Sequence, residues 1–143
     1  MYPFLKIFMA FSRLTGKSRY MTFPSSGTIA AGSAAQFDEN GEVAIAATNK
    51  QHVGVNIAAA TSSTNATLDI IDDGSIWRCT TLTGTYAASY IGQQVDIDAG
   101  LTVALGTTTN NDCTVVGGDL AGNTYVDIVF NQGGLRKTVV GLE

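Results

Sequence analysis

The sequence predicts an all-β protein: a small β-barrel or tulip-like sandwich with an extended N-terminal arm and at most one short helix. About eight to ten short segments of alternating or β-branched apolar residues recur along the body of the chain. Turn sequences rich in Gly, Asn and Asp separate them, and the sequence lacks the strand–helix–strand pattern of a parallel sheet. The chain has 143 residues and is 45% hydrophobic, which is enough to bury the core of one domain.

The clearest strand pair is a hairpin near the start of the body. Residues 34–38 and 42–46 alternate between apolar and polar positions, and the dipeptide Asn40-Gly41 lies between them. This dipeptide favours the positive φ angles of the tight turns that join two antiparallel strands. We therefore predict two paired strands here.

Three more strands complete the first half of the body. Residues 52–60, HVGVNIAAA, are apolar, and residues 66–72, ATLDIID, alternate until they reach an Asp-Asp-Gly turn. Residues 75–82, SIWRCTTL, also alternate, which places Trp77 and Cys79 on one face of the strand.

A break in the strand pattern opens the second half. Thr85 is predicted to cap a short helix that runs through Tyr90 and ends at Gly92. A tight turn at Ala99-Gly100 then joins two strands. The remaining strands are predicted at residues 94–99, 101–105, 112–117 and 124–131.

The N-terminal region differs from the rest in charge. The first twenty residues contain no acidic residue, yet they hold four of the eight basic residues of the chain. We therefore predict an N-terminal arm over residues 1–24, a body over 25–135 and a short C-terminal tail over 136–143.

Apolar residues in the arm recur at three- and four-residue spacing, at Phe4, Ile7, Phe8 and Phe11. This spacing predicts an amphipathic helical segment of two to three turns. Such a segment is marginal alone in water, so its apolar face needs another surface to cover it.

Residues 15–18, Thr-Gly-Lys-Ser, resemble the end of a phosphate-binding loop. That loop also needs a glycine five residues before Gly16, and Phe11 occupies the position. The motif should also open a helix in an α/β sheet, whereas here it precedes an all-β body. We predict no nucleotide site, and Gly16 is expected to mark a bend in the chain.

The charge of the body argues against nucleic acid as a partner. The net charge is −4 and the pI is about 4.7. Between Pro24 and Leu135 the basic residues are Lys50 and Arg78, against eleven carboxylates. Such a surface repels a phosphate backbone.

A membrane partner is not expected either, because the N-terminal apolar run is too short for a spanning helix. The same run does not fit a secretory signal, and a mitochondrial presequence stays open as an alternative.

No residue pattern points to catalysis, a metal or a cofactor. His52 is the single histidine, no Gly-x-Ser-x-Gly elbow is present, and we expect His52 at the surface or an interface. Cys79 and Cys113 are expected to be buried thiols, although a disulfide between them stays possible. We expect no enzymatic activity.

Paired carboxylates were the remaining candidates for acid–base chemistry or calcium binding. Asp96 and Asp98 share one strand face, which is typical of a solvated face. Asp69 precedes Asp72 and Asp73, and the latter two belong to an ordinary turn sequence. We therefore interpret these carboxylates as structural or solvent-facing.

The order of the segments resembles a known family. Residues 36–41 contain a Phe-Asp-x-x-Gly hairpin, residues 52–60 contain Val-Gly-Val followed by alanines, and residues 67–72 form an acidic strand. The second half adds IWRCTTLTGTY, YIGQQVDI and the closing VVGGDLAGNTYVDIVFNQ. Over residues 27–132 this pattern is similar to the decoration, or cement, proteins of tailed-bacteriophage capsids.

The resemblance implies a structural virion protein rather than an enzyme. It implies a small β domain that binds the major capsid protein on the outer face of an icosahedral shell, as a homotrimer, and stabilises contacts between capsomers. The protein would be made in the bacterial cytoplasm and reside at the capsid surface.

We expect the arm to bind the capsid through apolar and basic side chains, with the basic ones facing acidic groups of the shell. The candidate residues are Tyr2, Phe4, Leu5, Lys6, Ile7, Phe8, Phe11, Arg13, Lys17, Arg19 and Tyr20. The alternative function is a tail or fibre module that binds a host glycan through Trp77, Tyr86 and Tyr90.

Overall fold

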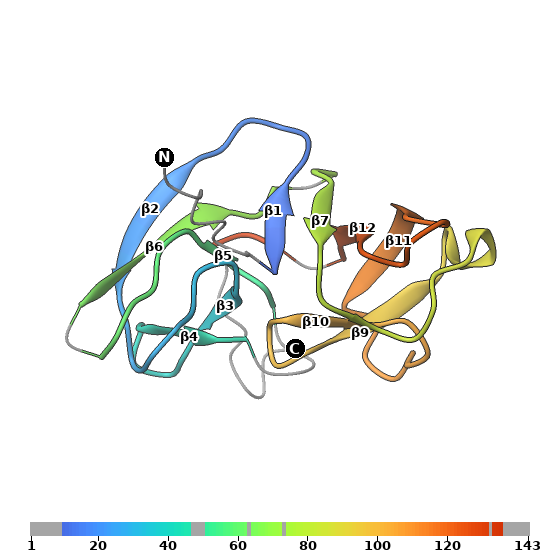
Figure 1. Ribbon diagram of the computed structural model, residues 1–143. Helices are drawn as coiled ribbons and strands as arrows, with labels where there is room; N and C mark the ends of the chain where they lie inside the picture. The colour runs from blue at the N-terminus through green and yellow to red at the C-terminus, as the bar shows by residue number, and fades with distance from the viewer. Residues whose placement is uncertain (1–9, 47–50, 63, 73, 132, 136–143) are drawn as a thin grey trace, which may run out of the picture.

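The computed structural model describes residues 10–46, 51–62, 64–72, 74–131 and 133–135 (Figure 1). The elements are β1 (Phe11–Arg13), β2 (Tyr20–Pro24), β3 (Ala34–Phe37), β4 (Val43–Ile45), β5 (Gly54–Asn56), β6 (Asn65–Ile70), β7 (Trp77–Cys79), β8 (Leu82–Thr83), the 3₁₀ helix η1 (Ala88–Tyr90), β9 (Gln94–Asp98), β10 (Thr102–Ala104), β11 (Cys113–Gly118) and β12 (Val126–Phe130).

The strands form two sheets that pack as a sandwich. One sheet has the order β1-β7-β12-β11-β9-β10-β8, and the other has the order β2-β6-β5-β3-β4. Their pairings are antiparallel except for β8 with β10. The prediction of an all-β sandwich is confirmed, and the described strands do not form the closed barrel that was the other predicted architecture.

Both sheets are strongly curved. β7 and β8 follow each other along the chain but lie far apart in the order of their sheet, which therefore bends back on itself. In the five-stranded sheet, an isolated bridge between Ser25 and Val43 brings the end of β2 beside β4. This curvature encloses two separate groups of apolar side chains.

The larger apolar core lies between the sheets. It joins Phe11, Trp77 and Phe130 of the seven-stranded sheet to Val55 of β5 and to Ile71, which directly follows β6. The ring of Phe130 contacts those of Phe11 and Trp77, with centroids 5.4 Å and 5.9 Å apart. These ring contacts connect β1, β7 and β12, three strands that lie in the middle of the view in Figure 1.

The smaller core fills the curve of the five-stranded sheet. Its members include Ile29, Val43, Leu68 and Ile70, which are fully buried. The alternation along β6 separates the two sides, because Leu68 faces this core while Asp69 faces the other sheet.

The predicted hairpin at residues 34–46 is confirmed. β3 pairs with β4, and the Asp38 carboxylate accepts hydrogen bonds from the backbone N–H groups of Asn40 and Glu42. Gly41 has a φ of 78°, which suits a residue without a side chain. The predicted turn after β9 is also present, with Ala99 and Gly100 both at positive φ.

The helix prediction needs correction. The observed element is one turn of 3₁₀ helix, Ala88–Tyr90, and its N-cap is Ala87 with no side-chain hydrogen bond. Thr85 therefore does not cap it. The segment before the helix is fixed by a different contact: the backbone N–H of Tyr86 donates a hydrogen bond to the Asn123 side chain at 2.8 Å.

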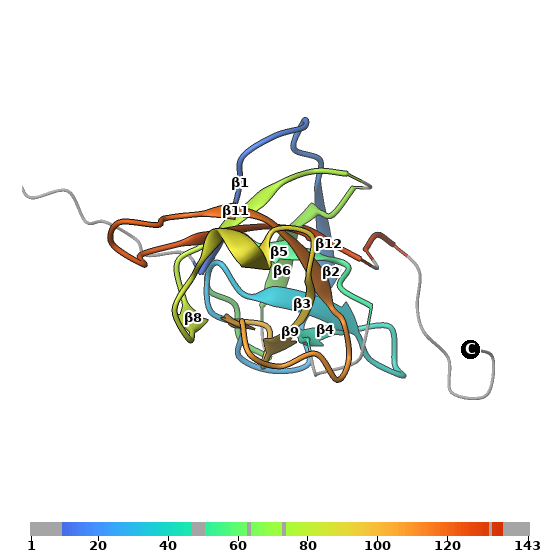
Figure 2. The ribbon, with the colours of Figure 1, turned by 90° about the vertical axis from the view of Figure 1, so that its right-hand side faces the viewer.

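The predicted arm over residues 1–24 is wrong for its described part. β1 pairs with β7 and β2 pairs with β6, so residues 11–13 and 20–24 belong to the two sheets. Phe11 completes the central core and cannot leave it without a large loss of apolar burial. The connection from β1 to β2 projects from the top of the molecule in both views (Figures 1 and 2). Residues 1–9 and the predicted tail 136–143 lie outside the described residues.

Candidate functional site

Arg13 and Asp69 form a buried ion pair that joins the two sheets. Nε of Arg13 donates to Oδ2 of Asp69 at 3.1 Å, and Nη2 donates to Oδ1 at 2.8 Å. Only 7% of the Arg13 side chain and 8% of the Asp69 side chain are exposed. Because Arg13 lies on β1 and Asp69 on β6, the pair fastens the seven-stranded sheet to the five-stranded sheet.

The remaining N–H groups of Arg13 also have partners. Nη2 donates to the carbonyl oxygen of Ile70 at 2.7 Å, and Nη1 donates to Ser75 Oγ at 3.0 Å and to the carbonyl oxygen of Thr15 at 3.4 Å. The guanidinium lies 4.5 Å from the centroid of the Trp77 ring. The hydrogen bonds with Asp69 raise the pKa of Arg13 above its ordinary value.

Asp69 is equally well satisfied. Besides Arg13, its carboxylate accepts a hydrogen bond from Ser18 Oγ at 3.0 Å and one from the backbone N–H of Arg19 at 3.3 Å. The β1–β2 connection is therefore tied at both ends to the same carboxylate. Gly16 forms the bend between them with a φ of 86°, as the sequence predicted.

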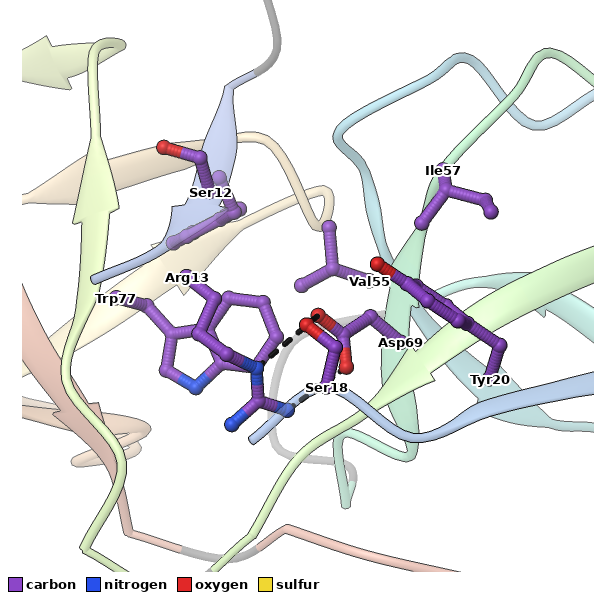
Figure 3. A pocket seen from close by; sticks show the side chains of 9 residues that line it. Ser12, Arg13, Ser18, Tyr20, Val55, Ile57, Asp69 and Trp77 are labelled. Carbon is purple, nitrogen blue, oxygen red and sulfur yellow. Dashed lines mark hydrogen bonds and ion pairs between the residues drawn. The ribbon is translucent and has the colours of Figure 1, made fainter. Parts of the chain in front are cut away.

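A pocket of about 330 Å³ opens beside this pair, between the two sheets (Figure 3). Trp77 and Arg13 lie on one side of it, and Tyr20, Val55 and Ile57 lie across from them. The lining residues are Phe11, Ser12, Arg13, Ser18, Tyr20, Val55, Ile57, Asp69 and Trp77.

Exposed apolar residues line the pocket, and exposed basic residues adjoin its lining residues in the sequence. Tyr20 is 58% exposed and Ile57 is 39% exposed, although both are large apolar side chains. Lys17 and Arg19 are exposed on the β1–β2 connection, and neither forms an ion pair with another described residue. We call Leu14, Lys17, Arg19, Tyr20 and Ile57 the rim. Tyr20 and Ile57 line the pocket, whereas Leu14, Lys17 and Arg19 are exposed and adjoin lining residues in the sequence.

The structure divides the predicted capsid-binding residues into three groups. Phe11 and Arg13 are buried and hold the sheets together, so their prediction as surface contacts is wrong. Lys17, Arg19 and Tyr20 lie on the rim and remain available. The others, Tyr2, Phe4, Leu5, Lys6, Ile7 and Phe8, lie outside the described residues.

Asp69, Ser18 and Ile57 were missed as site residues. Asp69 lies near Asp72 and Asp73 in the sequence, but its main partner, Arg13, lies 56 positions away. Ile57 lies in a run that was interpreted as an ordinary apolar strand. Local sequence patterns contain no signal for either long-range contact.

His52 is buried, which contradicts its predicted place at the surface or an interface. It is 1% exposed, and its ring centroid lies 5.3 Å from that of Phe130. Burial lowers its pKa from 6.5 to about 4, so the ring is neutral near pH 7. Among the described residues, neither His52 Nε2 nor Trp77 Nε1 has a hydrogen-bond partner.

Asp96 is also buried, so its predicted position on a solvated strand face is wrong, whereas Asp98 is exposed. Asp96 Oδ1 accepts hydrogen bonds from the backbone N–H groups of Asn110 and Asn111, at 2.7 Å and 2.8 Å. Asp96 therefore holds the loop before β11 in place. This is a structural role for a carboxylate that the strand pattern alone did not reveal.

The two thiols are free and buried, as predicted. Burial raises the pKa of Cys79 to about 11 and raises that of Cys113 further. Both thiols are protonated near pH 7, and neither is an activated nucleophile.

The proposed sugar-binding aromatics do not form a surface. Trp77 and Tyr86 are 1% and 5% exposed, and Tyr90 is partly buried against the central core. A sugar needs an accessible ring face on which to stack, and Trp77 and Tyr86 do not offer one.

Within the described residues, no group of three or more His, Cys, Asp or Glu side chains is placed to hold a metal ion. The same residues include no helix long and apolar enough to cross a membrane. A scan against protein-family models and a search of the curated proteins found no match for this chain.

Proposed function

We propose that this chain is a structural binding protein of a virion and that it performs no catalysis. More specifically, it decorates the outer face of a tailed-bacteriophage capsid, as a homotrimer that bridges neighbouring copies of the major capsid protein. The resemblance of residues 27–132 to capsid decoration proteins supports this proposal, and the all-β sandwich is compatible with it.

The observation that carries the proposal is the distribution of apolar and basic residues near the N-terminus. Residues 1–9 include Phe4, Leu5, Lys6, Ile7 and Phe8, and they enter β1 directly. The projecting β1–β2 connection then presents the rim residues, of which Leu14 and Tyr20 are strongly exposed. The described β1–β2 connection thus presents apolar and basic residues on a chain of net charge −4, and residues 1–9 add further apolar and basic residues in the sequence.

Such a surface suits repeated attachment to a shell. Apolar burial contributes about 25 cal/mol per Å², reduced by the entropy lost when a segment becomes ordered. Once one subunit of a trimer has bound the shell, the other two subunits bind at a high effective concentration. The total affinity of the trimer therefore rises although each subunit makes the same contacts. Basic rim residues add electrostatic attraction where the shell is acidic.

The first test is the composition of purified particles. Decoration predicts that the chain is present in an amount comparable to the major capsid protein, measured by quantitative mass spectrometry. A few copies per particle would fit a tail or fibre component instead, and absence from the particles would contradict the proposal.

The second test uses a truncation whose boundary follows the structure. Removing residues 1–9 leaves β1 intact, whereas removing residues 1–23 would delete Phe11, Arg13 and nearly all of β2. We expect the shorter truncation to fold and to bind stripped particles at least tenfold more weakly than the full chain. Equal binding would exclude residues 1–9 from attachment.

A further inference from the structure

We propose that the pocket between the sheets receives one apolar side chain from an acidic segment of the shell protein, with Lys17 and Arg19 contacting the acidic residues that flank it. This inference rests on the proposed function and adds the chemistry of the partner segment. It also assigns a binding role to Ile57 and Tyr20, which lie far apart in the sequence.

The size of the pocket is compatible with a single side chain. Its volume of about 330 Å³ lies at the lower end of the range of about 300 to 1,000 Å³ that is typical of small-molecule sites. A pocket of this size, open to solvent at an exposed rim, suits a single anchoring residue. Such anchors provide much of the binding energy in protein interfaces.

The lining of the pocket favours an apolar group. Tyr20 and Ile57 contribute exposed apolar surface to it, and Phe11, Val55 and Trp77, each at most 1% exposed, make up the rest of its apolar lining. The charged groups of Arg13 and Asp69 are already matched to each other and to neighbouring polar atoms. A charged group entering the pocket would lose its hydration and find no free partner of opposite charge there, which is costly.

The charges on the rim favour acidic neighbours of that anchor. Lys17 and Arg19 are exposed and form no ion pair among the described residues. The adjoining carboxylates of Asp69 and Asp72 both face Arg13, at 2.8 Å and 3.6 Å, so Arg13 balances one of these two negative charges, and the two positive charges of Lys17 and Arg19 exceed the one that is left. An acidic segment is therefore attracted to the rim, and this attraction weakens as the salt concentration rises.

The partner segment can also bury the exposed apolar side chains of the rim. Tyr20 and Ile57 flank the pocket mouth and both belong to the five-stranded sheet or its edge. Tyr20 is the first residue of β2, and Ile57 directly follows β5. Covering them adds apolar burial next to the anchor. A short segment would thus combine one buried contact with electrostatic contacts at its two sides.

The experiment titrates the isotope-labelled full chain with the peptide acetyl-Glu-Glu-Phe-Glu-Glu-amide and follows backbone amides by NMR. We expect weak binding, with a Kd of about 1 mM, and shifts concentrated at Ser18, Tyr20 and Ile57. The same peptide with Ala in place of Phe, and one with Lys in place of Glu, should each bind at least fivefold more weakly. Equal binding of either control peptide, or shifts elsewhere on the protein, would overturn the inference.

Variants connect the peptide result to the particle. Ile57→Asp and the double variant Lys17→Glu/Arg19→Glu should each weaken binding of the peptide and of stripped particles at least fivefold. Leu120→Asp is the matched control, because Leu120 is 67% exposed on the β11–β12 turn, far from the rim in sequence, and should change neither. The NMR spectra also report whether each variant is folded.

The two proposals fail in different ways. If the full chain binds particles and the rim variants bind them equally well, the pocket inference is wrong while the proposed function stands. If the full chain is absent from particles and does not bind them, the proposed function is wrong, whatever the peptide does.

Discussion

Two arginine–aspartate pairs in this protein have the same bidentate geometry but lie in different surroundings. Arg13–Asp69 joins the two sheets with side chains that are 7% and 8% exposed. Arg78–Asp127 links β7 to β12 within one sheet, at 2.9 Å and 3.1 Å, with side chains that are 35% and 15% exposed. Because the hydrogen-bond geometry is the same, we expect burial to determine how much free energy of unfolding is lost when one partner of each pair is removed.

The physical reason is the cost of an unpaired charge. In the buried pair, removing one partner leaves the other charge in a poorly hydrated place. In the exposed pair, water replaces the lost partner, and Arg78 still lies 3.6 Å from the Tyr125 ring centroid. Substitutions at the two sites should therefore differ in their effects.

The largest effect is expected for Asp69→Asn. This change keeps the shape of the side chain but leaves the buried Arg13 charge with only the more distant and more exposed Asp72 carboxylate, at 3.6 Å, so we expect a cost of up to about 3–5 kcal/mol. The free energy of unfolding in urea measures it. In the double variant Arg13→Met/Asp69→Leu both charges are gone, and we expect most of the stability to return. A double variant as unstable as Asp69→Asn would contradict this explanation.

The next effect concerns His52, a polar group buried without a charged partner. Its pKa is about 4 in the folded chain and 6.5 ordinarily, so the unfolded chain binds the proton first as the pH falls. Stability should therefore be highest above pH 6.5 and fall toward pH 4, by on the order of 3 kcal/mol from this residue. Unfolding followed across this pH range, with His52→Leu as the variant that cannot titrate, isolates the effect. Identical pH dependence in both proteins would argue against it.

A smaller effect is expected for Gly16→Ala, which tests the loop that closes over the buried pair. Gly16 has a φ of 86°, and a Cβ atom there would lie 2.7 Å from Ser75 Oγ and 3.0 Å from Arg13 Nη1. We expect a loss of about 2 kcal/mol. Gly41→Ala is the control, because Gly41 has a φ of 78° but open space around it, so only the backbone penalty of about 1 kcal/mol applies. Equal losses would mean that the contacts with Ser75 and Arg13 do not matter.

The smallest effect is expected for Asp127→Asn in the exposed pair. Its cost should stay below about 1 kcal/mol, because solvent screens the charge that remains on Arg78. Thermal unfolding at low and high salt would check this. A loss as large as that of Asp69→Asn would remove the distinction between the two pairs.

The sequence was informative where contacts are local. Alternation and turn residues predicted the all-β class, the hairpin at Asn40-Gly41 and the turn at Ala99-Gly100, because these depend on neighbours along the chain. In the N-terminal region, Phe4, Ile7, Phe8 and Phe11 have helical spacing, which favours a separate helical segment. In the folded chain, pairing between β1 and β7 overrides that spacing at Phe11.

The candidate site could be predicted only in part. Lys17, Arg19 and Tyr20 were identified from charge and composition, and they do lie on an exposed rim. The pocket itself depends on contacts between β1, β2, β5, β6 and β7, which are brought together by the fold rather than by the sequence order. The Arg13–Asp69 pair shows the same limit, since no local pattern links residues 56 positions apart.

The most direct test of the central claim is a cryo-electron microscopy map of the intact particle. We predict trimeric density on the outer face of the capsid that fits the two-sheet body, with the β1–β2 connection and residues 1–9 directed toward the shell. A map with no such density on the capsid, or with this surface directed away from it, would contradict the account.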